Sequence, residues 1–223
     1  MYNIFYMLFL TRYIGNKNGK VQKSSYDIRT KQVQEEHLKE ETEKYKLDLH
    51  IPVILGIENK QLEKQVIDDI DKDKNNFVKE LKQATNEYMT PNIPYFLESS
   101  YNIYNHDFNI LSFCILYSNY YGGAHPMSHK ICYNYDIKLG KRIMLKDLFN
   151  NELYKSFINK EIEKQIINRN EVVGYEVINA FKGIHDNQKF YIKNRELVIY
   201  FDLYDIAPYV AGIIEFTMPK EIF

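Results

Sequence analysis

Alternating apolar and polar residues on both sides of a glycine pair constrain the fold of this chain more than any other feature. The pair is Gly122-Gly123, and a hairpin turn centred on Gly123 places Phe113 opposite Tyr133. This register gives both strands one apolar and one polar face, as cross-strand packing requires. The apolar face also pairs Leu111 with Tyr135 and Ile115 with Ile131, and the polar face carries Ser112, Asn134 and Lys130. Residues 111–135 are therefore predicted to form an antiparallel hairpin.

The same register places the only two cysteines, Cys114 and Cys132, directly across from each other. Opposed residues of antiparallel strands have Cα separations in or near the range of a disulfide, so the sequence leaves open whether the two are bonded. Because two cysteines provide no framework of several bridges, we expect free thiols.

Helices and strands are predicted in separate runs along the chain. The clearest helix is predicted over residues 59–89, where apolar residues recur every three, four or seven positions. A second amphipathic helix is predicted over 151–168, and its inward residues are predicted to be Leu153, Phe157, Ile158, Ile162 and Ile166. Strands are predicted over 26–34, 45–54, 95–104, 109–121, 127–139, 190–201 (a hairpin turning at Asn194-Arg195) and 213–218. This order predicts an α+β fold with mainly antiparallel sheets, two main amphipathic helices and two closely packed lobes.

The length of 223 residues suits one large domain or two small ones. We predict an apolar stub and linker over 1–25, an N-terminal α+β lobe over 26–121 and a C-terminal α+β lobe over 122–223. The apolar residues 1–10 are fewer than the roughly 20 that cross a bilayer, and they lack the flanking features of a signal peptide. They are interpreted either as the remaining end of a membrane anchor or as an apolar arm docked on the fold.

Charge and composition narrow the classes of partner. With 29 basic and 30 acidic residues the net charge is −1, so the chain lacks the basic footprint of a nucleic-acid-binding protein. Its 20 tyrosines suit half-buried sheets and recognition surfaces alike. Most of them lie in predicted strands, which favours a structural role for the majority.

Common catalytic and metal-binding patterns are missing from the sequence. His125 and His129, four residues apart on a strand, would be separated by about 13 Å, which is too far for one metal ion. The acidic run DDIDKDK (68–74) lies within the predicted helix and lacks the glycine and closing glutamate of a calcium loop. Nucleophile-elbow, zinc-protease and phosphate-loop motifs do not occur. We therefore expect no catalytic residue, no bound metal and no cofactor.

Two long segments resemble a bacterial family. Residues 119–149, NYYGGAHPMSHKICYNYDIKLGKRIMLKDLF, resemble its signature Y-x-GGAH followed by Y-N-x-D-x-x-x-GK and DLF. Residues 181–219, FKGIHDNQKFYIKNRELVIYFDLYDIAPYVAGIIEFTMP, are similar to the C-terminal half of that family. From about residue 26 onward, the chain resembles the paired domains of unknown function in the ectodomain of RsiV-type anti-sigma factors. The same type of domain occurs beside the deacetylase module of PdaC-like enzymes.

This resemblance implies a non-catalytic binding role. In the RsiV branch of the family, the domain pair binds host lysozyme, after which proteolysis frees a sigma factor. The implied location is extracytoplasmic, at the bacterial cell surface or anchored in the membrane by a segment upstream of the folded domain. The implied partner is a lysozyme-like protein or, as for PdaC-like deacetylases, a cell-wall glycan. A cell-wall hydrolase is the less favoured alternative.

The expected binding surface joins two loops that are rich in tyrosine and glycine. Tyrosine rings offer rigid amphipathic contacts at a low entropic cost, and proline fixes the conformation of its loop. His125 is expected to support the first turn through a hydrogen bond of its ring. The predicted ligand-binding residues are Tyr120, Tyr121, Gly122, Gly123, His125, Tyr204, Pro208 and Tyr209. The alternative is structural: the glycines serve only the backbone of the turns, and Tyr204 and Tyr209 pack one lobe on the other.

Overall fold

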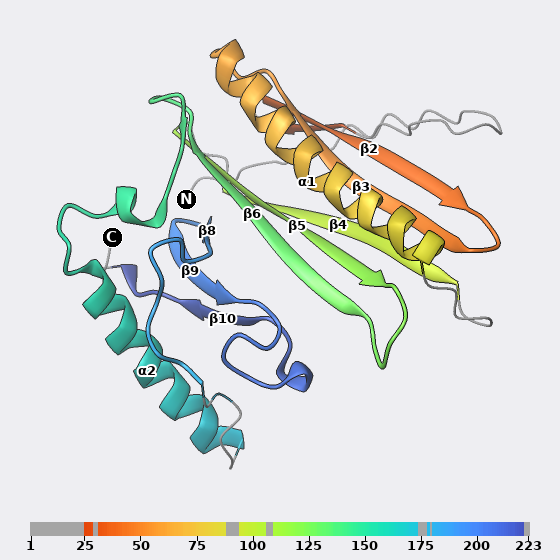
Figure 1. Cartoon of the computed structure of the whole chain (residues 1–223). Helices are drawn as coiled ribbons and strands as arrows, with labels where there is room; N and C mark the ends of the chain where they lie inside the picture. The colour runs from red at the N-terminus through yellow and green to blue at the C-terminus, as the bar shows by residue number, and fades with distance from the viewer. Residues whose placement is uncertain are drawn as a thin grey trace. The chain divides into compact units, whose positions relative to one another are not determined.

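The computed structural model describes residues 25–28, 31–87, 94–105, 109–173, 178 and 180–220 (Figure 1). The predicted apolar stub and nearly all of the predicted linker, residues 1–24, lie outside these ranges. Within them the chain forms a seven-stranded sheet, a three-stranded sheet and two α-helices. The predicted α+β class is therefore confirmed.

The seven-stranded sheet follows the order of the chain. Its strands are β1 (Ser25–Ile28), β2 (Lys31–Glu41), β3 (Tyr45–Leu55), β4 (Tyr95–Asn105), β5 (Ile110–Tyr120), β6 (Met127–Asp136) and β7 (Lys141–Arg142). The pairs β1–β2, β2–β3 and β6–β7 are antiparallel, whereas β3 and β4 are parallel. A parallel pair needs a long crossover, which the helix α1 (Lys60–Glu87) supplies. The single strand predicted over 26–34 is instead a hairpin of β1 and β2.

The three-stranded sheet has the order β10-β9-β8 and is antiparallel throughout. Its strands are β8 (Phe190–Lys193), β9 (Glu196–Phe201) and β10 (Ile214–Thr217). Asn194 and Arg195 join β8 to β9, and their φ angles of 52° and 64° are those of a two-residue type I′ turn. The hairpin predicted to turn at these two residues is confirmed.

The described residues fall into two compact units. Unit 1 comprises the chain up to Tyr101 together with Ile115–Met127, and unit 2 comprises Asn102–Cys114 and the chain from Ser128 onward. The strands β4 and β5 each contribute to both units, so neither unit is one continuous stretch of chain. The predicted domain boundary after residue 121 stays a prediction.

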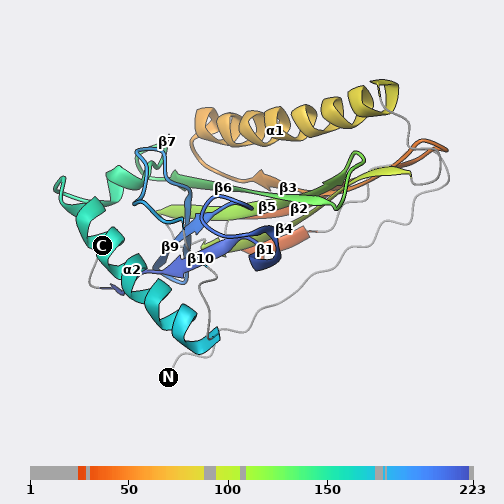
Figure 2. The ribbon, with the colours of Figure 1, turned by 60° about the horizontal axis from the view of Figure 1, so that its bottom comes forward.

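In unit 1, α1 packs on one face of the sheet that contains β3 (Figure 2). Asn59 caps the start of the helix, because its Oδ1 accepts hydrogen bonds from the backbone N–H groups of Gln61 and Leu62, both at 3.1 Å. The buried interior contains Leu62, Val66, Ile70 and Leu81 of the helix and Leu47, Leu49, Ile51 and Ile54 of β3. The apolar stripe that predicted this helix is thus the face that packs on the sheet.

The β5–β6 hairpin has the register predicted about Gly123. The rings of Phe113 and Tyr133 stack with centroids 4.9 Å apart, and Cys114 and Cys132 have Cα atoms 4.0 Å apart. The two cysteines form a disulfide, so the expectation of free thiols is wrong. Direct opposition across two strands brings the sulfur atoms within bonding distance, and this geometry outweighs the argument from the small number of cysteines.

In unit 2, the helix α2 (Tyr154–Val173) packs on the three-stranded sheet. The buried interior contains Tyr154, Ile158 and Ile162 of the helix with Phe190, Ile192, Leu197, Ile199 and Phe216 of the strands. Leu153 and Phe157, which were predicted to face inward, are 63% and 53% exposed. Ile158 and Ile162, which were predicted to face inward as well, are buried, so the predicted face is confirmed there and is wrong at Leu153 and Phe157.

Candidate binding surfaces

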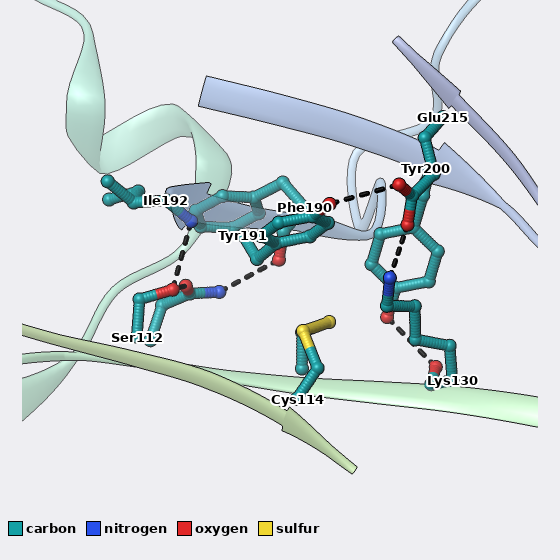
Figure 3. The surroundings of a disulfide bond; sticks show 10 residues. Ser112, Cys114, Lys130, Phe190, Tyr191, Ile192, Tyr200 and Glu215 are labelled. Atoms are coloured by element: carbon teal, nitrogen blue, oxygen red, sulfur yellow. Dashed lines mark hydrogen bonds and ion pairs between the residues drawn. A yellow bond between two sulfur atoms is a disulfide. The ribbon is translucent and has the colours of Figure 1, made fainter. Parts of the chain in front are cut away.

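A disulfide lies against a group of tyrosine rings in unit 2 (Figure 3). The tyrosine–disulfide cluster consists of Cys114, Cys132, Tyr104, Tyr191, Tyr200, Lys130 and Glu215. Tyr104 and Tyr191 stack with ring centroids 4.5 Å apart, and the Lys130 ammonium lies 4.6 Å from the centroid of Tyr191. Such contacts between a cation and an aromatic face are attractive, most of all where water is excluded.

Hydrogen bonds fix the polar groups of this cluster. Lys130 forms an ion pair with Glu215, whose Oε2 accepts a hydrogen bond from the Tyr191 hydroxyl at 3.0 Å. The Tyr200 hydroxyl donates to the backbone carbonyl of Lys130 at 2.9 Å. Burial raises the pKa of both phenols well above the usual value, and the Glu215 charge raises them further. These tyrosines therefore stay neutral and serve structure rather than proton transfer.

Two buried polar side chains connect β5 and β6 to β8. The Ser112 hydroxyl donates to Asn134 Oδ1 at 2.7 Å and accepts from the backbone N–H of Ile192 at 2.9 Å. The Asn134 amide donates to the carbonyl of Phe190 at 2.9 Å. The polar face predicted for the hairpin is thus satisfied inside the protein rather than by solvent.

The first predicted binding loop, residues 120–125, lies in unit 1 and is mostly held by internal contacts. The Tyr120 hydroxyl donates to the Gly123 carbonyl at 3.0 Å, and the Tyr121 hydroxyl donates to the carbonyl of Phe77 in α1 at 3.3 Å. Burial raises the pKa of Tyr121, with a smaller contribution from Glu80. The partly buried ring of Tyr121 thus contributes to packing as well as to the surface.

Backbone geometry explains the two glycines of this loop. Gly122 and Gly123 have φ angles of 90° and 106°, which residues other than glycine rarely adopt because their Cβ atom clashes with the backbone. Gly123 is exposed, and a Cβ placed there would meet no atom within 4 Å. The ring Nδ1 of His125 lies 3.0 Å from the carbonyl oxygen of Pro126, the kind of supporting hydrogen bond that was expected of it. The roles of Tyr120, Tyr121 and His125 in ligand binding stay predictions.

The second predicted loop, residues 204–212 of unit 2, presents apolar side chains to solvent. Val210 is 90% exposed and Tyr204 is 55% exposed, and the ring of Tyr204 lies 5.8 Å from that of Tyr209. The loop is anchored by Ile206 and Ala207, which are only 4% and 8% exposed. The loop therefore exposes Tyr204 and Val210, together with Asp205, beside a buried base.

Backbone features add to the order of the 204–212 loop. Pro208 is exposed and precedes the short 3₁₀ helix η2 (Tyr209–Ala211), and Gly212 ends that helix with a φ of 71°. Tyr204 itself has a φ of 70°, which is uncommon for a residue with a side chain. Loops 120–125 and 204–212 belong to different units, so their joining into one surface stays a prediction.

A pocket of about 400 Å³ lies beside the 204–212 loop in unit 2. It is lined by Ala180, Lys182, Gly183, His185, Asn187, Gln188, Lys189, Phe201, Asp205 and Ile206. Most of this lining comes from residues 180–189, which form no regular helix or strand. The sequence analysis missed the pocket because an irregular segment has no periodicity from which its side-chain directions can be inferred.

A histidine–aspartate cluster in unit 1 was also missed. Nε2 of His37 lies 2.6 Å from Oδ1 of Asp48, and the rings of His37 and His50 stack with centroids 4.2 Å apart. Partial burial raises the pKa of Asp48, but the hydrogen bond from His37 and the nearby charges outweigh it, so the pKa is lowered. The predicted strand over 26–34 ended before His37, so this residue was never placed opposite β3.

No helix in the described ranges is both long and apolar enough to cross a membrane.

Comparisons with known proteins agree with the family resemblance. The family model described as deacetylase PdaC matches residues 38–128, and that of the protein of unknown function DUF3298 matches residues 146–221. The anti-sigma-V factor RsiV of Bacillus subtilis (strain 168) is 28% identical over 193 residues. That match covers 83% of this chain but 66% of the relative, so the chain spans slightly less than two thirds of the relative's length.

Two solved structures have the same fold. A member of the DUF3298 family from Bacteroides fragilis NCTC 9343 matches with a TM-score of 0.60 at 17% identity, over 85% of this chain and 90% of the other. A DUF3298 family protein from Pseudomonas aeruginosa PAO1 matches with a TM-score of 0.62 at 14% identity, over 86% of this chain and 91% of the other. Both family models matched in order, together with a relative aligned across most of the chain, support a paired PdaC/DUF3298 domain of the RsiV type.

Proposed function

We propose that this chain is the extracytoplasmic binding part of a membrane-anchored regulatory protein, and that it binds a lysozyme-like protein through the 204–212 loop. The similarity to an anti-sigma factor over 83% of the chain supports a regulatory role. The Cys114–Cys132 disulfide supports an extracytoplasmic location, because disulfides persist in oxidising compartments and are rare in the cytosol.

The exposure of Val210 and Tyr204 on an anchored loop is the observation that carries the proposal. Tyrosine rings near the centre of a protein interface are common energetic hot spots, and the apolar side chains around them exclude water from the contact. Because the loop base is already buried, little conformational entropy is lost when a partner covers it.

The electrostatics favour binding over catalysis. The carboxyl groups of Glu41, Asp48, Glu63 and Asp186 have lowered pKa values, with nearby lysines or histidines among the causes in each case. A glycosidase-type general acid needs a carboxyl group with a raised pKa. The chain is therefore proposed to be non-catalytic.

The test measures binding of hen egg-white lysozyme to the immobilised chain by biolayer interferometry. We expect Val210→Asp to weaken binding at least tenfold, equivalent to about 1.4 kcal/mol, because it places a charge in the apolar contact. Leu139→Asp is the matched control, since Leu139 is 65% exposed in the β6–β7 turn and should leave binding unchanged. Wild-type chain that fails to bind lysozyme, or equal losses in both variants, would contradict the proposal.

A cell-wall glycan is the second candidate ligand, favoured by the pocket beside the loop. Lys182, Asn187 and Lys189 present polar groups along its lining, as a saccharide site requires. Calorimetric titration with soluble peptidoglycan fragments should show binding that Lys182→Ala/Asn187→Ala abolishes and Val210→Asp leaves unchanged. Fragments that do not bind, in a chain that does bind lysozyme, would exclude this candidate.

A further inference from the structure

Three side chains that can ligate a metal converge on the face of the unit 1 sheet that points away from α1. Strands β2 and β3 pair His37 directly with His50, and Asp48 precedes His50 by two residues, so all three share one face. Glu36, the neighbour of His37, points to the opposite face and forms an ion pair with Lys74 of α1 at 2.9 Å. The candidate ligand atoms of the three residues lie within 4.8 Å of one another.

Both imidazole rings present Nε2 to the same carboxylate oxygen. Oδ1 of Asp48 lies 2.6 Å from Nε2 of His37 and 3.5 Å from Nε2 of His50. A tetrahedral ion with bonds of about 2.0–2.1 Å holds its ligand atoms about 3.4 Å apart. The present separations lie on both sides of this value, so small side-chain rotations are sufficient to admit an ion.

Glu35 determines which nitrogen of His50 faces the cluster. Oε1 of Glu35 lies 3.2 Å from Nδ1 of His50, and Glu35 is on the same face because it pairs with Pro52. A metal-bound histidine usually donates its second ring N–H to a carboxylate in this way, which fixes the tautomer and the ring orientation. With Nδ1 as the donor to Glu35, the lone pair of His50 Nε2 is directed at Asp48.

We propose that His37, Asp48 and His50 form a binding site for a divalent transition metal, and that zinc is the ion that fits best. Two imidazole nitrogens and one carboxylate oxygen match the ligand preference of zinc and leave a fourth position for water or another ligand. The side chains are 19%, 35% and 41% exposed, so an ion reaches them from solvent while the site stays partly shielded. Lys39 lies 3.5 Å from the other oxygen of Asp48, which leaves Oδ1 for the metal.

The site lies in unit 1, whereas the proposed binding loop lies in unit 2. Zinc would replace the hydrogen bond between Nε2 of His37 and Oδ1 of Asp48 with bonds from both atoms to the metal. Occupancy would fix β2 to β3 at the middle of their pairing.

Calorimetric titration of zinc chloride into the tag-free, chelator-treated chain at pH 7.5 tests the site. We expect one ion per chain, and at least a tenfold loss of affinity in His37→Gln and in His50→Gln. Glu35→Gln should also weaken binding, by about tenfold or more, through loss of the second contact of His50. His129→Gln, on β6, is the matched control for non-specific histidine binding and should match the wild-type protein.

Wild-type binding no tighter than that of the His37→Gln/His50→Gln double variant would overturn the proposal. A second measurement uses the unaltered protein, so that misfolding of a variant cannot decide the outcome. Crystals soaked in zinc chloride should show an anomalous peak at the zinc edge about 2.1 Å from Nε2 of His37 and His50. A peak elsewhere, or none, would equally refute the site.

Discussion

Removal of the Cys114–Cys132 disulfide should cost about 3 kcal/mol of stability. The bond closes a loop with a sequence separation of 18 residues. Loop-closure entropy of about −2.1 − 1.5R ln n cal/mol/K, with n near 18, gives about 3 kcal/mol at 25 °C, nearly all of it through the unfolded chain. Reduction should therefore destabilise the protein without changing the secondary structure of the native state.

Urea denaturation followed by circular dichroism measures this difference. Oxidised wild-type protein is compared with protein that was reduced under denaturing conditions and refolded in the reductant, with two free thiols verified by titration. Cys114→Ala/Cys132→Ala is the control, because its unfolding should not respond to the reductant. Complete reduction that changes the free energy of unfolding by less than about 1 kcal/mol would refute the reasoning.

Three further perturbations test the packing and the charges. Tyr121→Ala should lower the free energy of unfolding by about 2 kcal/mol, because the tyrosine ring is partly buried and its hydroxyl donates a hydrogen bond to α1. Val210→Ala should change the free energy of unfolding by less than about 0.5 kcal/mol in the same urea titration. Equal effects of the two substitutions would contradict the assigned burial. Glu215→Gln should lower the free energy of unfolding by about 2 kcal/mol, because Lys130 would keep its charge in a largely enclosed site. Glu196→Gln, at the start of β9, should change it very little, because that side chain is 40% exposed and lies 3.8 Å from Lys220. The pKa of Asp48 is lowered from its usual 3.8, so its contribution is present above about pH 4 and is lost as the pH falls through the folded value. Thermal melting between pH 7 and pH 3 should therefore show a steeper acid loss for the wild-type protein than for Asp48→Asn, and parallel curves would refute it.

The sequence could predict those strands in which apolar and polar residues alternate. The β5–β6 register followed from this alternation, because each strand carries apolar residues on one side and small or polar residues on the other. The β8–β9 turn followed from Asn194-Arg195, since asparagine tolerates a positive φ.

Strand pairing by residues that show no alternation was the part that the sequence could not predict. Residues 35–41, EEHLKEE, contain one apolar residue, Leu38, so no alternation marks them as a strand. They extend β2 because they pair with residues 46–52 of β3. The histidine–aspartate cluster was missed with them, because His37 and His50 become neighbours only once that pairing is known.

The disulfide has a consequence for the order in which the protein is assembled. Its two cysteines belong to one hairpin, and hairpins close in about 1–10 µs, far faster than a chain is synthesised. In an exported chain, the bond can therefore be made before the residues of β8, β9 and β10 have emerged. A shift of the β5–β6 register by one residue would put the two sulfur atoms on opposite faces of the sheet. The disulfide therefore cannot form in that register, and its formation favours the native one. The disulfide can thus fix the native register of β5 and β6 before the last strands of the chain are available to fold.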